Sequence, residues 1–174
     1  MSTLYFRLFV TTPETLKTKS LMEDFLNKYD LSPYLFTKSV KIKPNVIPHS
    51  HPMLTLNTFW NESPNHLLST FLHEQIHWFL NWSDPKKYTH AHRTFMDWYP
   101  IVPSDRSLTA SNQFSTYLHL SVCWLELQGV KRYLGAKEGY KTIQTFQHYR
   151  WIYDRVVADE SAIGDLLNQI GLVI

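Results

Sequence analysis

Apolar and polar residues alternate in short segments of the N-terminal half, and this pattern predicts β-strands there. SVKIK at 39–43 and MLTLNTF at 53–59 both alternate, and LYFRLFV at 4–10 is rich in the aromatic and aliphatic residues that strands favour. Two helices are expected in the same half. One runs from Pro13 to about Tyr29 behind a Thr-Thr-Pro start. The other follows Ser63–Pro64 to about Trp82, where apolar residues recur at helical spacing.

The C-terminal part of the chain is predicted to be helical, because no proline follows Pro103 and proline is the residue that most reliably interrupts a helix. Helices are expected at 112–128, 137–157 and 160–170. Residues 83–111 contain three prolines and no clean period, so they are predicted to form a long irregular crossing that walls a cleft and selects substrate. The expected architecture is a single α+β domain that spans all 174 residues.

Composition narrows the class of protein and its partners. With 44% hydrophobic and 18% charged residues, the chain fits a globular protein. Its formal charge is +2 without a long run of one sign, so neither nucleic acid nor a membrane surface is an expected partner. Cys123 is the single cysteine, which excludes an internal disulfide and fits the reducing cytoplasm. No leader sequence, membrane-spanning apolar run or glycine-rich nucleotide loop is recognised.

The second predicted helix contains the pattern His73–Glu74–Gln75–Ile76–His77, which reads HExxH. Histidines four residues apart lie about 40° apart around a helix and one turn along it, so both imidazoles can reach one metal ion. Glu74 lies on the flank of that face, where its carboxylate can act as a general base toward water. The rest of this helix is apolar, so the three polar side chains need partners, which a metal ion would supply.

The segment FLHEQIHW resembles the active-site helix of the HExxH zinc metallopeptidases, the zincins. The resemblance covers one helix of the chain. It implies Zn²⁺ bound by His73 and His77, Glu74 as the catalytic base, and a small sheet packed on the motif helix with more helices after it. The metzincin extension is absent, because Leu80 and Ser83 stand where that pattern has glycine and histidine. The resemblance is therefore gluzincin-like and implies a third ligand on a later helix.

The next predicted helix offers two candidates for the third ligand. Its polar residues form one narrow stripe that includes His119, Cys123 and Glu126, so we expect a buried helix whose stripe faces the metal. His119 and Glu126 stand about 10 Å apart along the axis, so one ligates and the other supports it. His119 is preferred because its neighbours in the stripe are small, and Glu126 is the alternative. His90 and His92, in the irregular crossing, are further alternatives.

Tyr149, in the predicted helix at 137–157, is expected to donate a hydrogen bond to the developing oxyanion, where zincins commonly place a tyrosine or histidine. The alternative is simple packing in an aromatic stripe with Tyr153. Cys123 is expected to behave as a small hydrophobic residue. Three more histidines could line a cleft but are expected to be loop, surface or capping residues: His49, His51 and His66.

The function predicted from these residues is zinc-dependent hydrolysis in which Glu74 deprotonates the attacking water. A peptide or small amide substrate follows from the resemblance alone, because neither fold nor motif fixes a substrate. The many aromatic residues leave open a hydrolase or lyase that acts on a small molecule in a closed pocket. A non-catalytic binding protein stabilised by a metal ion is the other alternative.

Overall fold

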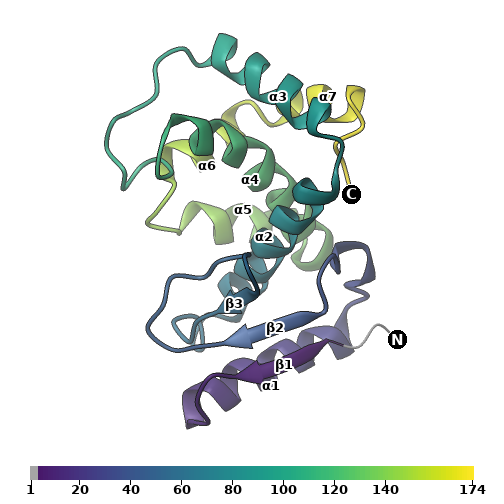
Figure 1. The fold of residues 1–174 in the computed structure, drawn as a ribbon, viewed down its shortest axis with the longest axis vertical. Helices are drawn as coiled ribbons and strands as arrows, with labels where there is room; N and C mark the ends of the chain where they lie inside the picture. The colour runs from purple at the N-terminus through teal and green to yellow at the C-terminus, as the bar shows by residue number, and fades with distance from the viewer. Residues whose placement is uncertain (1–3) are drawn as a thin grey trace. The chain divides into compact units, whose positions relative to one another are not determined.

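The computed structural model describes residues 4–174, which form a mixed α+β structure, and this confirms the α+β part of the expected fold class (Figure 1). The expectation that the chain lacks a leader also concerns residues 1–3, which lie outside the described residues. The chain divides into two compact units, Met1–Phe79 and Leu80–Ile174. The boundary between them falls within the long helix that carries the HExxH motif.

The first unit has its strands and helices where the sequence pattern predicts them, together with one short 3-10 turn. Their bounds are β1 (Tyr5–Leu8), α1 (Pro13–Lys28), η1 (Ser32–Tyr34), β2 (Ser39–Ile42), β3 (Leu54–Leu56) and α2 (Pro64–Trp82), whose last turn enters the second unit. The strands are shorter than the alternating segments. After β1, for example, the Phe9 N–H still donates to the Ile42 carbonyl at 2.9 Å, and the chain then bends toward α1.

The three strands form one parallel sheet in the order β1-β2-β3 (Figure 1). Parallel neighbours need a crossover connection, and α1 provides it between β1 and β2. Alternate residues of β2 and β3 point to one face of the sheet and are completely buried: Val40, Ile42, Leu54 and Leu56. The opposite face carries polar residues, with Arg7 of β1 directly beside Lys41 of β2. The sheet therefore has one core face, and its opposite face reaches solvent along β1 and β2, whereas Thr55 of β3 is buried.

Helix α1 begins at the Thr-Thr-Pro sequence, as predicted. The Thr12 hydroxyl accepts a hydrogen bond from the Thr15 N–H at 3.4 Å, and the Thr15 hydroxyl accepts one from the Thr12 N–H at 2.9 Å. Pro13 occupies the first helical turn, where a missing N–H leaves no hydrogen bond unmade. This reciprocal cap fixes the point at which the chain leaves β1 and enters α1.

The second unit is helical, with α3 (Pro85–Trp98), α4 (Gln113–Leu134), α5 (Ala136–Gln144), α6 (Arg150–Ala158) and α7 (Glu160–Gln169). Helix α4 packs against all four of the others (Figure 1). Most of its side chains are buried, as its narrow polar stripe predicts. It continues past Gly129, where an end was expected, because Gly129 is buried inside the helix. It ends instead at Gly135, whose φ of 82° favours glycine.

Residues 83–111 are not one irregular crossing, so that prediction is wrong for their first half. Asp84 caps α3 by accepting the Lys86 N–H at 2.9 Å, and Pro85 stands in the first helical turn. Phe95 is fully buried, whereas Trp98 at the end of the helix is exposed. Exposed aromatic residues blurred the helical period of this segment. The irregular parts are the short connection at 83–84 and residues 99–112.

The helix predicted at 137–157 is two helices, α5 and α6, separated by residues 145–149. Tyr149 adopts the left-handed conformation, with φ of 58° and ψ of 25°, immediately before α6. In the same connection Phe146 is buried and stacks on Tyr153, with ring centroids 5.6 Å apart. The helix is thus interrupted where Phe146 is buried in the core of the second unit, and no glycine or proline in the connection predicted the interruption.

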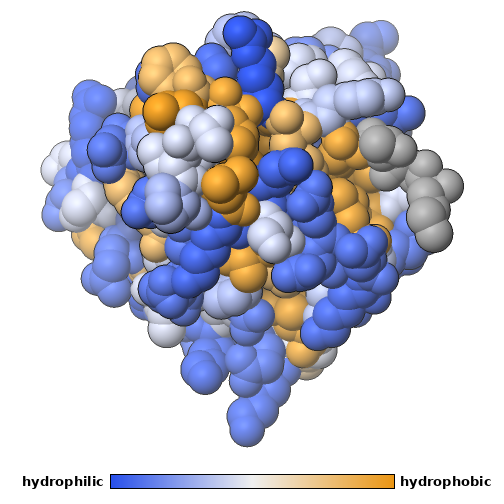
Figure 2. Space-filling model, turned by 90° about the horizontal axis from the view of Figure 1, so that it is seen from below, coloured by the Kyte–Doolittle hydropathy of each residue, from blue (hydrophilic) through white to orange (hydrophobic). Residues whose placement is uncertain are grey.

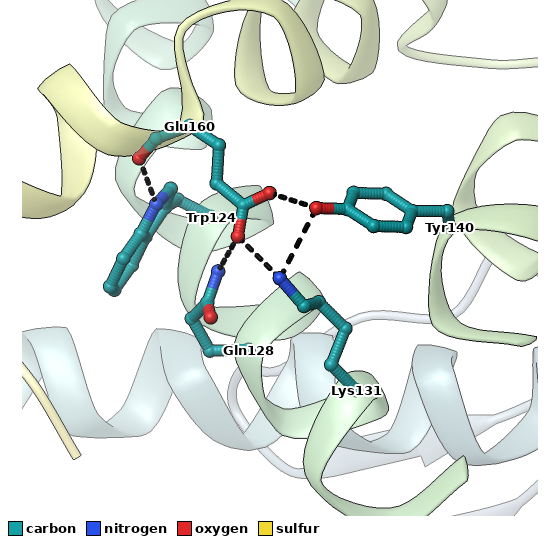
Figure 3. A network of polar contacts seen from close by, with 5 residues as sticks. All are labelled: Trp124, Gln128, Lys131, Tyr140 and Glu160. Atoms are coloured by element: carbon teal, nitrogen blue, oxygen red, sulfur yellow. Dashed lines mark hydrogen bonds and ion pairs between the residues drawn. The ribbon is translucent and has the colours of Figure 1, made fainter. Parts of the chain in front are cut away.

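A network of polar contacts centred on Glu160 joins α4, α5 and α7 (Figure 3). The Glu160 carboxylate accepts hydrogen bonds from Lys131 Nζ at 2.6 Å, Gln128 Nε2 at 2.9 Å and the Tyr140 hydroxyl at 2.5 Å. Its backbone carbonyl accepts the Trp124 indole N–H at 2.8 Å. Burial alone would raise the pKa of Glu160, but these donors hold it below its ordinary value. Burial alone would lower the pKa of Lys131, but its bonds to Glu160 and Tyr140 outweigh this effect and raise that pKa.

Large hydrophobic side chains also reach the surface. On the face shown in Figure 2 they gather in bands between hydrophilic residues. In the first unit, the most exposed large hydrophobic residues are Tyr5, Phe9, Ile47 and Phe59. None of the helices within residues 4–174 combines the length and apolarity that a membrane span requires.

Candidate functional site

The HExxH motif lies in the middle of α2, and the core of the first unit holds that helix. Its N-terminal turn starts at Ser63, whose carbonyl accepts the His66 N–H at 2.9 Å. Leu68, Phe71 and Leu72 are fully buried just before the motif, and Ile76 is buried within it. The motif is therefore carried by a rigid, well-packed element rather than by a loop.

His73 and His77 lie next to each other on one side of α2. Their ring centroids are 5.0 Å apart and their planes meet at 66°. His73 is only 8% exposed and Glu74 only 6%, while His77 is half-buried. The one-turn spacing thus places the two imidazoles side by side, with the Glu74 carboxylate buried beside them on the same helix. Their roles as metal ligands and catalytic base stay predictions.

Gln75, between the two histidines in the sequence, anchors α2 to the segment that leads into β2. It is fully buried. Its Oε1 accepts the N–H groups of Phe36 and Thr37, both at 2.9 Å, and its Nε2 donates to the Thr37 carbonyl at 2.8 Å. These three bonds fix the rotation of α2 about its axis, and with it the direction in which His73 and His77 point. The sequence signal was a polar residue among buried apolar ones, but its partners lie far away in the chain.

The other histidines of the first unit have local roles. His66 stacks on Trp60, with ring centroids 4.7 Å apart, and His51 stacks on Trp78 at 4.3 Å. His49 pairs through its backbone with Thr55 at the edge of β3, and its Nδ1 lies 2.9 Å from the Ile47 carbonyl. Each contact agrees with the expectation that these three residues are loop, surface or capping histidines.

In the second unit, the polar stripe of α4 is buried. His119, Cys123 and Glu126 are all shielded from solvent. The Nδ1 atom of His119 lies 2.6 Å from the carbonyl oxygen of Ser115. A carbonyl can only accept, so Nδ1 carries a proton, and in the neutral imidazole Nε2 then carries the lone pair. This is the tautomer in which a histidine binds a metal through Nε2, with its other nitrogen held by a backbone carbonyl.

Glu126 is engaged by Tyr153. The Tyr153 hydroxyl donates to the Glu126 carboxylate, with distances of 3.0 Å and 3.3 Å to its two oxygens. Burial raises the pKa of Tyr153 well above its ordinary value, and the Glu126 charge raises it further. The phenol therefore remains a donor across the physiological pH range. The sequence placed Tyr153 in an aromatic stripe but did not indicate this bond.

Tyr149 lies against His119, with ring centroids 4.7 Å apart and planes at 52°. It also contacts His148, at 5.2 Å between centroids. The structure thus brings together two residues that the sequence singled out separately, although Tyr149 precedes α6 rather than lying inside a helix. Its role toward an oxyanion stays a prediction.

His90 and His92 lie on α3, not in a loop as expected. His90 is exposed. The His92 ring packs against Phe114 and Tyr117, with centroid distances of 4.7 Å and 5.3 Å. Burial lowers the pKa of His92, although a hydrogen bond with the Phe114 backbone acts in the opposite direction. An aromatic environment of this kind favours neutral packing of His92 rather than metal ligation.

The predicted site residues thus come from both units. His73, Glu74 and His77 belong to the first, and His119, Glu126 and Tyr149 belong to the second. Imidazole nitrogens and carboxylate oxygens are the donors that catalytic zinc uses, and the His119 tautomer fits that use. Comparison of the chain with protein-family models, curated proteins and solved structures finds no match.

Proposed function

We propose that this chain is a zinc-dependent hydrolase with a zincin-like fold, and that it cleaves peptide or small amide bonds. The observation that carries the proposal is the pair of adjacent imidazoles, His73 and His77, on a buried helix that also buries Glu74. A Zn²⁺ ion is the partner that two imidazoles one turn apart are suited to bind.

Under this proposal the third ligand comes from α4. The candidates are His119 and Glu126, which lie with Cys123 on the buried polar stripe of that helix. We favour His119, because its bond to the Ser115 carbonyl presents Nε2 as a ligand. Glu126 is the alternative, and its bond from Tyr153 also suits a supporting role.

Zinc, when bound, supplies a positive charge that polarises a carbonyl group and makes water more acidic. The proposed roles of the chain's own residues follow from their chemistry. The Glu74 carboxylate accepts a proton from the attacking water and passes it to the leaving amine. The Tyr149 hydroxyl donates a hydrogen bond to the developing oxyanion. The single, buried Cys123 is compatible with activity in the cytoplasm, where we place the protein in this proposal.

Metal analysis of the purified full-length protein tests the proposal first. We expect one zinc ion per chain, lost in His77→Ala. The matched control is His66→Ala on the same helix, which removes a histidine that stacks on Trp60 and should leave zinc content unchanged. His119→Ala and Glu126→Gln then decide the third ligand, since removal of a ligand lowers zinc affinity more than removal of a supporting group. Wild-type protein without zinc, even after incubation with it, would contradict the proposal.

Glu74→Gln tests the catalytic step. The variant should keep its zinc and lose cleavage of a peptide library by about 100-fold or more, because a carboxamide cannot accept the proton. Glu62→Gln, an exposed glutamate just before α2, is the control and should retain activity. Unchanged turnover in Glu74→Gln would refute the assignment of this base.

A non-catalytic protein stabilised by a metal ion is the second candidate. Buried Cys123 and Glu126 on α4 favour it, because further protein ligands would close the position that a reacting water needs. Chelation separates the two candidates. Removal of a structural ion unfolds the protein, whereas removal of a catalytic ion abolishes turnover and leaves the fold intact.

A further inference from the structure

The solvent-facing side of the parallel sheet is both basic and aromatic. We define the outer sheet face by Tyr5, Arg7, Phe9, Lys41 and Lys43. Successive residues of a strand point to opposite faces, so Tyr5 and Arg7 share one face of β1, and Arg7 is the direct neighbour of Lys41 in β2. Tyr5, Arg7 and Phe9 are exposed and Lys41 and Lys43 are half-buried, whereas the residues on the opposite face of β2 are buried in the core.

Contacts between rings and cations confirm that Phe9 belongs to this face. Lys43 Nζ lies 4.5 Å from the centroid of the Phe9 ring, and Lys41 Nζ lies 5.8 Å from it. Tyr5 is 66% exposed and Phe9 58% exposed, so both rings are available to a ligand. With a rise of about 3.3 Å per residue, the Cα atoms of Tyr5 and Phe9 are roughly 13 Å apart in an extended chain, and that of Arg7 lies midway between them.

The positive charge of the outer sheet face is not neutralised locally. Residues 4–13 and 36–56 contain four cations, Arg7, Lys38, Lys41 and Lys43, but no aspartate or glutamate. The ion pairs between described residues involve other cations, such as those of α1 and α4. The whole-chain charge of +2 hides this cluster, because acidic residues elsewhere balance it.

We propose that the outer sheet face binds single-stranded nucleic acid. Arg7, Lys41 and Lys43 would pair with phosphates, and Tyr5 and Phe9 would stack on bases. A positively charged surface with exposed aromatic rings is the combination that unpaired strands use, because every base offers a flat face for stacking. An acidic peptide would use the cations but not the rings, and a duplex keeps its bases stacked on each other. The inference depends on the sheet alone and is independent of the metal.

Fluorescence anisotropy with a labelled oligothymidylate of about twenty nucleotides tests the proposal on the full-length protein. Three phosphate contacts predict a slope of about −2 for the logarithm of the binding constant against that of salt concentration. Affinity should therefore fall about 20-fold between about 50 mM and about 200 mM salt. Absence of saturable binding at the lower salt, or equal binding of a duplex of the same length, would overturn the proposal.

Replacement of the three cations tests the phosphate contacts. The triple variant Arg7→Ala, Lys41→Ala and Lys43→Ala should bind at least about 10-fold more weakly, with a salt slope near zero. A control removes the same charges from exposed positions of the second unit: Lys86→Ala, Arg132→Ala and Lys137→Ala. An equal loss in the control would mean that overall charge, and not this face, attracts the oligonucleotide.

Replacement of the two rings separates nucleic acid from an acidic protein. Tyr5→Ala combined with Phe9→Ala should weaken binding about 30-fold while the salt slope stays unchanged, since each stacked base contributes about 5-fold or more. Phe59→Ala, another exposed aromatic of the first unit, is the control. Binding of polyglutamate as tight as that of oligothymidylate would overturn the proposal in favour of an acidic partner. Ultraviolet cross-linking of the wild-type protein gives a readout without mutation, because the cross-linked peptides should contain β1 or β2.

Discussion

The Glu160 network predicts a measurable loss of stability in Glu160→Gln (Figure 3). The carboxamide keeps the shape of the side chain but removes its charge, and its amino group cannot accept the bonds now donated by Lys131, Gln128 or Tyr140. A hydrogen bond to a charged group contributes about 1.5–3 kcal/mol. The side chains of Glu160 and Lys131 are 20% and 22% exposed, so solvent screening places the net loss near the lower end, at about 2 kcal/mol. For a chain of this size, that lowers Tm by about 4–8 °C.

The pH dependence of this loss follows from the direction of the pKa shifts. The folded state lowers the pKa of Glu160, so the carboxylate stabilises the fold above its unfolded-state pKa, and the contribution is lost as pH falls through the lowered value. The folded state raises the pKa of Lys131, so the ammonium contributes fully below its unfolded-state pKa and is lost as pH rises through the raised value. The difference between wild type and Glu160→Gln should therefore be complete at neutral pH and vanish in acid.

Urea denaturation followed by circular dichroism measures the free energy of unfolding of both proteins at neutral and acidic pH. Glu138→Gln is the control, because the Glu138–Lys141 pair on α5 is exposed, with 4.0 Å between its charged atoms, and should contribute less than about 1 kcal/mol. A difference for Glu160→Gln no larger than that of the control at neutral pH would refute the reasoning. So would a difference of equal size in acid.

Three further substitutions test the packing of the two units by thermal unfolding. Gln75→Leu should cost about 2–4 kcal/mol, because it leaves buried backbone groups at 36–37 without their partner; a loss below 1 kcal/mol would contradict that anchoring. Gly164→Ala should cost about 1–3 kcal/mol, because its Cβ would stand 2.7 Å from the Trp124 ring, and a neutral result would mean that the ring moves freely. Asn112→Ala should cost about 1 kcal/mol by removing the 2.8 Å cap at the start of α4, and an unchanged Tm would show that water replaces it.

Short sequence signals, such as helix caps and prolines, correctly predicted where several helices begin. Ser63–Pro64 marks the start of α2 because a cap and a proline fix a first helical turn whatever follows. Asp84 and Pro85 carry the same signal for α3, but exposed aromatic residues obscured the period behind them. The helix expected at 112–128 continues through Gly129, which is buried inside α4 despite the low helix propensity of glycine. Tertiary packing therefore decided the boundaries that the sequence pattern missed.

In the candidate site, too, contacts within one helix could be predicted from the sequence, whereas contacts between distant helices could not. His73, Glu74 and His77 could be grouped from the sequence because one helical turn fixes their spacing. The tautomer of His119 also depends on a local contact, to Ser115 one turn earlier. The hydrogen bond from Tyr153 to Glu126 joins two helices that are distant in the chain, and the sequence pattern of neither helix predicts it.

The backbone of Tyr149 bears on how this protein would evolve. Its left-handed conformation is one that asparagine or glycine adopts with less strain, and a bulky residue there costs about 1 kcal/mol or more. Selection for thermal tolerance alone would therefore tend to replace this tyrosine with asparagine. Selection for whatever the ring does beside His119 would keep it. The residue found at this position after each kind of selection would therefore show whether stability or a role of the tyrosine ring was selected.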